Sequence, residues 1–212
     1  MDLFSSETLI TFIIATVLLG FTPGPDNIFV LIQSALYGRK AGVIVTLGLC
    51  TGLVGHTLAV TLGLAAVFEV SVMAFTVLKV LGAGYLIYLA WRAFTASSET
   101  IDGGGSPMLS HWQLYKRGVL MSSTNPKLAI FFLAFLPQFA DPGRGSLSLQ
   151  LMSLGGIFIF FSFWVMAFIA IMSGSISERI KRSDSTQKWI NRLAGTVFVA
   201  LALRLLTTGQ SD

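Results

Sequence analysis

Charged side chains are scarce in this sequence of 212 residues. Its 14 Lys and Arg and 10 Asp and Glu make up 11% of the chain, against about 25% in soluble domains. Hydrophobic residues make up 54%. So few charges cannot cover the surface of a soluble protein of this size. The apolar runs are continuous and do not alternate as membrane β-strands do, so the sequence predicts an all-α integral membrane protein.

The sequence has only one cysteine and none of the common catalytic motifs. Cys50 is the single cysteine, which excludes an intramolecular disulfide and a thiol–disulfide electron carrier. Two histidines and seven scattered methionines do not form a metal-binding pattern. We therefore expect no bound metal and no cofactor. A metal-ion exporter with a similar helical architecture stays an alternative. No HExxH, GxSxG or P-loop motif is present, so we expect no enzymatic activity. The acidic N-terminus has no basic n-region, so no cleaved signal peptide is expected.

Six apolar segments are long enough to cross a bilayer, which takes about 20 helical residues. They cover residues 8–37, 41–68, 72–94, 118–140, 147–173 and 189–206. Ten of the 14 basic residues fall in the connections after the first, third and fifth segments: Arg39, Lys40, Arg92, Lys116, Arg117, Arg179, Lys181, Arg182, Lys188 and Arg192. The positive-inside rule places these connections in the cytoplasm and both termini outside. The net charge of +4 therefore does not indicate a nucleic-acid partner.

An internal repeat divides the chain into two halves. The segment PDNIFVL at 25–31 resembles PKLAIFF at 126–132, and KVLG at 79–82 resembles RLAG at 192–195. Each pair occupies the same place in a group of three spans, and an odd number of spans makes the two halves point in opposite directions. We therefore predict a single membrane domain, 1–212, built from two inverted three-helix repeats. Repeat 1 covers about 1–94, a linker about 95–115, and repeat 2 about 116–208.

Prolines interrupt the first and fourth spans at the same position of the repeat. A proline removes a backbone donor, and in a membrane the freed groups need protein, water or ligand as partners. We therefore expect helices 1 and 4 to be discontinuous near the midplane, with half-helix N-termini suited to a carboxylate. The candidate substrate-binding residues lie at these two breaks: Pro23, Gly24, Pro25, Asp26, Asn27, Asn125, Pro126 and Lys127.

Three ionisable residues fall near mid-membrane. Asp26 and Lys127 each follow the repeat proline, where a lone charge costs at least about 2.5–3.5 kcal/mol. They are either a structural pair or groups that also contact substrate or a coupling proton, and we expect them to face one another across a cavity. His56 follows Gly48 and Gly52 at intervals of four. It is either a helix-interface histidine or, with Asp26, a proton-coupling group, because histidine titrates near physiological pH.

Several motifs together resemble the LysE/RhtB family of amino-acid exporters. They are TPGPDN at 22–27, YGRKAG at 37–42, GAGYLIYL at 82–89, TNPK at 124–127 and FLPQF at 135–139. They run in the expected order over nearly the whole chain. The resemblance implies a permease of the bacterial inner membrane that exports amino acids by proton antiport. The expected partners are therefore an amino acid, protons and membrane lipid, with a homo-oligomer left open.

The resemblance does not name one substrate, because members of the family export lysine, arginine, leucine, threonine or homoserine. The mid-membrane acids and bases balance in this chain, which favours neutral cargo such as threonine, homoserine or leucine. A cationic amino acid or another small metabolite stays the alternative.

Overall fold

The computed structural model describes residues 3–22, 24–68 and 109–182, together with scattered positions between 77 and 95 and between 189 and 206. Pro23, most of the predicted linker, and half or more of the predicted third and sixth spans lie outside the described residues. In chain order the elements are α1 (Ser6–Phe21), α2 (Pro25–Tyr37), α3 (Arg39–Phe68), α5 (His111–Thr124), α6 (Pro126–Ile130), the π-helix η1 (Phe131–Phe135), the 3₁₀ helices η2 (Leu136–Phe139) and η3 (Pro142–Arg144), and α7 (Leu147–Arg182). Every regular element in this part of the chain is helical, so the predicted all-α class is confirmed.

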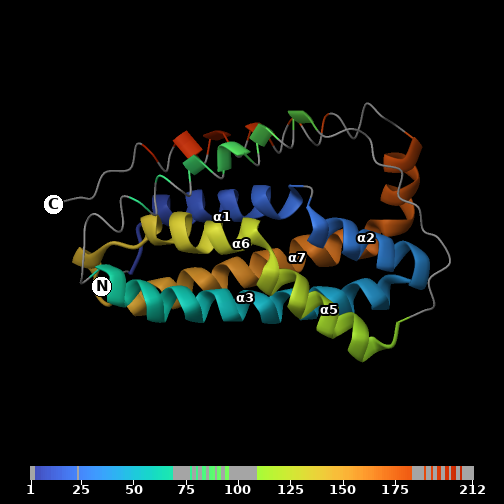
Figure 1. The fold of residues 1–212 in the computed structure, drawn as a ribbon, viewed down its shortest axis with the longest axis horizontal. Coiled ribbons are helices and arrows are strands. Elements are labelled where there is room, and N and C mark those ends of the chain that lie inside the picture. Colours follow the sequence, from blue (N-terminus) through green and yellow to red (C-terminus); the bar gives the residue numbers. More distant parts are fainter. Residues whose placement is uncertain are drawn as a thin grey trace.

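The described helices form a bundle of long rods (Figure 1). Both α3, over Arg39–Gly63, and α7, over Leu147–Ser173, are apolar and long enough to cross a membrane. Two further candidate spans are bent pairs: α1 with α2, at 58°, and α5 with the segment Pro126–Phe139, at 48°. These four candidate spans correspond to the predicted first, second, fourth and fifth segments.

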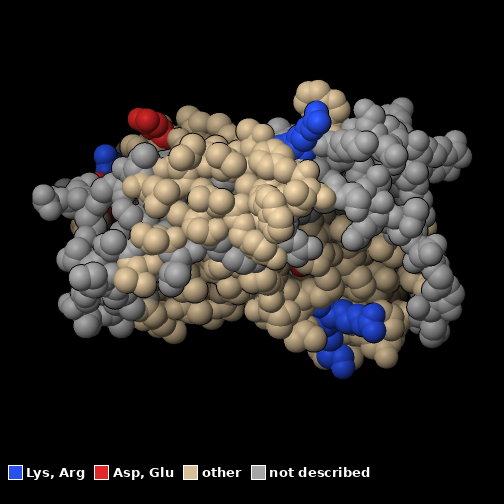
Figure 2. Space-filling model, turned by 45° about the horizontal axis from the view of Figure 1, so that its top comes forward, with Lys and Arg blue, Asp and Glu red and all other residues tan. Residues whose placement is uncertain are grey.

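The basic connections gather at one end of the bundle. The junction of α2 with α3, the start of α5 and the end of α7 lie together at the right of Figure 1, opposite the N-terminus. We call this the basic end, because it carries Arg39, Lys40, Lys116 and Arg117. The face drawn in Figure 2 is otherwise mostly uncharged over its described surface, as expected for a surface in contact with lipid.

Small residues bring α3 and α5 into backbone contact. A Cβ atom added at Gly48 would clash with the carbonyl oxygen of Tyr115, and one added at Gly52 would lie 2.6 Å from Cβ of Ser122. The reciprocal clash occurs at Gly118, whose added Cβ would meet the carbonyl oxygen of Val45. The two helices therefore run parallel, packed as small residues at intervals of four allow.

Two hydrophobic clusters occupy different levels of the bundle. The aliphatic cluster lies towards the basic end and consists of Val30, Ala41, Val45, Leu49, Leu114, Met166 and Ala170. The aromatic cluster lies towards the other end and contains Phe12, Phe131, Phe132, Phe135, Phe139 and Phe158. Within it, the rings of Phe131 and Phe158 have centroids 5.0 Å apart, as do those of Phe12 and Phe139.

The second half of the fourth span is less regular than a plain half-helix. After α6 the chain widens into η1, where the N–H of Leu136 bonds to the carbonyl of Phe131, five residues earlier. It then tightens into η2, in which Pro137 has no N–H to donate. Four of the five η1 residues are buried. The local pattern of apolar residues did not predict this change of helix type, because π-helical and α-helical segments share the same apolar composition.

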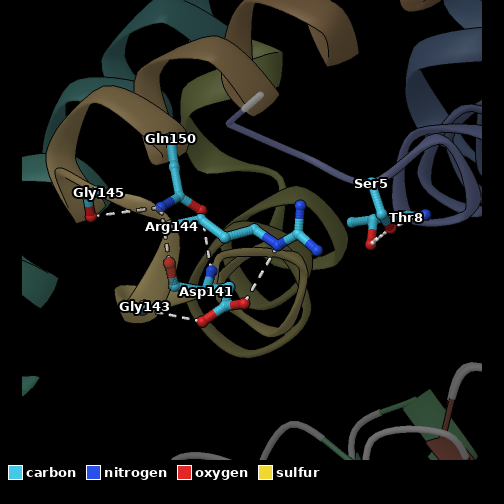
Figure 3. A network of polar contacts seen from close by, with 7 residues as sticks. All are labelled: Ser5, Thr8, Asp141, Gly143, Arg144, Gly145 and Gln150. Atoms are coloured by element: carbon cyan, nitrogen blue, oxygen red, sulfur yellow. Dashed lines mark hydrogen bonds and ion pairs between the residues drawn. The ribbon is translucent and has the colours of Figure 1, made fainter. Parts of the chain in front are cut away.

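The turn before α7 is fixed by a polar network at the end opposite the basic one (Figure 3). The Gln150 amide donates to the carbonyl oxygens of Asp141, at 2.8 Å, and Gly145, at 3.4 Å. Its Oε1 accepts from the N–H of Asp141 at 2.8 Å. The Asp141 carboxylate accepts from the N–H of Gly143 at 2.9 Å and pairs with Arg144 at 3.3 Å. The side chains of Gln150 and Asp141 therefore satisfy several backbone groups of this turn.

Candidate functional site

The first helix break uses side chains in place of the lost backbone donors. Pro25 starts α2, and the preceding helix has already ended at Phe21. The amide of Asn27 turns back and donates to the carbonyl of Gly20 at 2.6 Å. The N–H of Thr22 donates to the carbonyl oxygens of Leu18 and Leu19 in the preceding turn. Asn27, one of the predicted site residues, thus connects the start of α2 to the end of α1 by a hydrogen bond.

The second break is satisfied from a neighbouring helix. Pro126 has no N–H for the carbonyl of Ser122, four residues earlier. Nε2 of His56 lies 3.0 Å from this oxygen, and the N–H of Asn125 reaches it at 3.1 Å. A carbonyl can only accept, so Nε2 of His56 is the donor. His56 is half-buried, and its ring lies beside Phe132, with centroids 5.6 Å apart.

Asn125 joins the two breaks. Its Oδ1 accepts from the N–H of Lys127 at 3.0 Å, which caps α6. Its Nδ2 donates to Oδ2 of Asp26 at 2.7 Å. In the other direction, Nζ of Lys127 points to the carbonyl of Thr22 at 3.5 Å. Each break therefore supplies a polar partner to the other.

Gly24 makes room for the Lys127 ammonium group. A Cβ atom added at Gly24 would lie only 3.0 Å from Nζ of Lys127. Gly24 is the N-cap residue of α2 and has no side chain. The N–H groups at the start of this 13-residue helix therefore receive no side-chain capping hydrogen bond. The sequence placed Gly24 in the site, and the structure gives it this spatial reason.

Asp26 and Lys127 meet at one cavity without bonding directly. Both side chains are buried, with 3% and 7% of their surface exposed. No ion pair joins them in the described part of the chain, where the single salt bridge is Asp141 with Arg144. Instead, Oδ2 of Asp26 accepts from the Asn125 amide, and Oδ1 of Asp26 is buried with no hydrogen-bond partner. A free carboxylate oxygen and a weakly bonded ammonium thus lie at the same cavity.

The cavity lies between the aliphatic and aromatic clusters. Its free volume is about 30 Å³, which admits water but is too small for an amino acid. The lining residues come from both bent spans and from α3 and α7: Leu19, Gly20, Asp26, Leu49, Cys50, Leu53, Ser122, Lys127, Leu128, Phe158, Ser162 and Met166. Two opposite charges therefore face a wall that is otherwise mainly apolar.

The predicted site residues fall into three groups. Asp26 and Lys127 line the cavity, and Gly24, Asn27 and Asn125 position them or hold the breaks. The prolines Pro25 and Pro126 are exposed and interrupt the helical pattern of backbone hydrogen bonds. Pro23 lies outside the described residues. His56 does not line the cavity but supports the second break.

The sequence did not identify most of the cavity wall. Leu49 and Leu53 on α3, and Phe158, Ser162 and Met166 on α7, come from unbroken helices. No local break or charge marks these positions. Ser162 is one of several hydroxyl residues inside the apolar segments, such as Thr46 and Thr57, so it did not stand out either.

The chain is similar to known proteins over most of its length. The family model described as "LysE type translocator" matches residues 17–209. The chain is 28% identical over 208 residues to an uncharacterized membrane protein, YrhP, of Bacillus subtilis (strain 168), covering 93% of this chain and 98% of that one. It is 27% identical over 199 residues to a leucine efflux protein of Enterobacter sp. (strain 638), covering 92% and 93%. No solved structure matches.

The chain belongs to the LysE-type translocator family, as the sequence motifs indicated. It is a multi-pass membrane protein of a family of small-molecule translocators.

Proposed function

We propose that this protein exports a small neutral amino acid from the cytoplasm across the bacterial inner membrane, by proton antiport. The observation that carries the proposal is the cavity at which one buried acid, Asp26, and one buried base, Lys127, meet beside two helix breaks. A charge pair of this kind complements a zwitterion. The leucine efflux protein among the relatives supports the same class of cargo.

Each end of a zwitterion has a partner at this site. The substrate carboxylate approaches Nζ of Lys127 and the N-terminal amides of α2, where the helix dipole is positive. The ammonium group approaches Oδ1 of Asp26, the oxygen that lacks a partner. No further acid lines the cavity, so a cationic side chain would find no counter-charge. The apolar wall formed by residues such as Leu53 and Phe158 instead suits an uncharged side chain.

Asp26 is our main candidate for proton coupling. When Asp26 takes up a proton it loses its attraction for the ammonium group, so proton binding and cargo binding compete at one carboxylate. His56 is the second candidate, because its ring can gain a proton at Nδ1 while Nε2 keeps its bond to Ser122. In this scheme the proton enters as the amino acid leaves.

The proposed architecture is six spans in two inverted repeats, with both termini outside and the basic end in the cytoplasm. The two bends fall at matching positions of the repeat, after Phe21 and after Thr124. The basic connections lie at one end of the bundle (Figure 1). Both observations support the arrangement, which requires that residues 72–94 and 189–206 each form a span.

The test is efflux from liposomes containing the purified protein. Vesicles are loaded with labelled leucine, threonine, homoserine or lysine, and efflux is timed with and without an acidic exterior. We expect a neutral amino acid to leave faster than lysine, and an inward proton gradient to accelerate it. If no amino acid moves under either condition, the proposed function is wrong.

A further inference from the structure

Buried oxygen atoms without hydrogen-bond partners concentrate on one helix. Eight side-chain atoms of this kind occur among the described residues, and four of them belong to α2. They are Oδ1 of Asp26, Oδ1 of Asn27, Oε1 of Gln33 and Oγ of Ser34. Each of these residues has less than a tenth of its surface exposed. Such groups are costly to leave unpaired in a dry interior.

The four residues form a stripe on one face of α2, interrupted by the buried apolar residues Val30 and Leu31. Asp26 with Gln33, and Asn27 with Ser34, are seven residues apart, which places each pair on the same face two turns along the helix. The stripe runs from the cavity towards the basic end over about 10 Å at 1.5 Å per residue. The opposite face of α2 carries exposed apolar side chains, with Ile28 38% and Leu36 45% exposed. The buried face of α2 therefore carries polar groups on either side of Val30 and Leu31, and the exposed face is apolar.

The inner face of α2 packs against α3 and α7. Ser34 packs directly against Gly42 of α3, and a Cβ atom added at Gly42 would also lie 2.9 Å from Cβ of Ala170 on α7. Val30, on the same face, is fully buried in the aliphatic cluster. Val30 therefore belongs to the apolar seal between α2 and its neighbours α3 and α7.

We propose that this stripe of α2 is one wall of a water-filled path that opens between the basic end and the cavity, and that cargo enters along it. Water then satisfies the four oxygens that lack partners in the closed arrangement. The aliphatic cluster is the seal that parts, while the aromatic cluster stays closed on the other side of the cavity. The direction of entry rests on the proposed export function; the path itself does not.

Cysteine labelling tests the path. Single cysteines are introduced as Gln33→Cys or Ser34→Cys in the Cys50→Ser chain, which has no other thiol. A membrane-impermeant, charged methanethiosulfonate reagent is added to inside-out or right-side-out membrane vesicles. The matched controls are Ile28→Cys and Leu36→Cys on the lipid-facing side of the same helix. Since thiols react as hydrated thiolates, we expect the first pair to be labelled at least about tenfold faster than the controls, from the cytoplasmic side only.

A third control separates this inference from the proposed orientation. Lys40→Cys lies exposed at the basic end and reports on which side that end faces. If Lys40→Cys is labelled from the cytoplasmic side but Gln33→Cys and Ser34→Cys react no faster than Ile28→Cys and Leu36→Cys, the path is wrong. Labelling of the two inner positions only from the side opposite to that on which Lys40→Cys reacts also overturns it. Labelled inner positions in a protein that moves no amino acid support the path and refute the export function.

Discussion

The Asp26 carboxylate accepts a hydrogen bond of 2.7 Å from the Asn125 amide, 99 positions away in the sequence. This contact connects the first turn of α2 to the residue that caps α6. The same asparagine also holds the backbone of Lys127. One side chain therefore holds the Asp26 carboxylate and the backbone from which the Lys127 side chain extends.

Asn125→Ala should destabilise the protein and slow export. It removes the cap of α6 and the partner of a buried carboxylate, each worth roughly 1–2 kcal/mol. Asn125→Ser separates the two roles, because a serine can still cap the helix but is too short to reach Asp26. We expect it to recover part of the melting temperature and little of the transport rate.

The measurements for Asn125 are thermal melting in detergent and efflux per molecule of inserted protein. The exposed neighbour Ser123 provides the control, since Ser123→Ala should behave as wild type. An Asn125→Ala protein that melts and exports like wild type would show that the bridge is unimportant.

Close packing of α3 on α5 gives a second prediction. Gly48→Ala introduces a methyl group against the backbone of α5 and should cost about 1–3 kcal/mol, as overpacking does. Gly55→Ala on the same helix meets nothing within 4 Å and should be neutral or slightly stabilising, because alanine favours helix more than glycine. Melting temperatures of the two variants compare them directly. Equal values would refute the backbone contact.

The outlines of the first and fourth spans could be predicted because prolines and charges mark breaks locally. Asn125 could be placed at a break, but not as a bridge to Asp26, since that contact depends on how two helices distant in sequence meet. The wall contributed by Phe158 and Met166 was missed for the same reason. The π-helix at Phe131–Phe135 also carries no distinct composition, so its geometry emerges only from tertiary packing.

His56 provides a test between a supporting and a titrating role. His56→Gln keeps a donor for the carbonyl of Ser122 but cannot titrate, whereas His56→Leu loses the donor. If Asp26 carries the proton, His56→Gln should keep the pH dependence of export, and His56→Leu should lower the melting temperature. Export rates measured across a pH series decide the matter. A folded His56→Gln protein whose export no longer depends on pH would make His56 the coupling group.

Cys50 allows the cavity to be blocked chemically. It lines the cavity, which has a free volume of only about 30 Å³, so attaching even a methylthio group should obstruct cargo. We expect methyl methanethiosulfonate to inhibit export by the wild-type protein, with excess cargo slowing the inhibition. Whatever export Cys50→Ser retains should be insensitive to the reagent. Inhibition of that variant to the same extent would show that the reagent acts elsewhere.

Efflux of a labelled neutral amino acid by the single variants Asp26→Asn and Lys127→Met tests the substrate site most directly. Rates are measured in liposomes and normalised to correctly folded, inserted protein. Each variant removes one of the two charges that hold the zwitterion, so we predict a loss of at least about tenfold, equivalent to about 1.4 kcal/mol, in each. Export by both variants at the wild-type rate would contradict the assignment of this cavity as the substrate site.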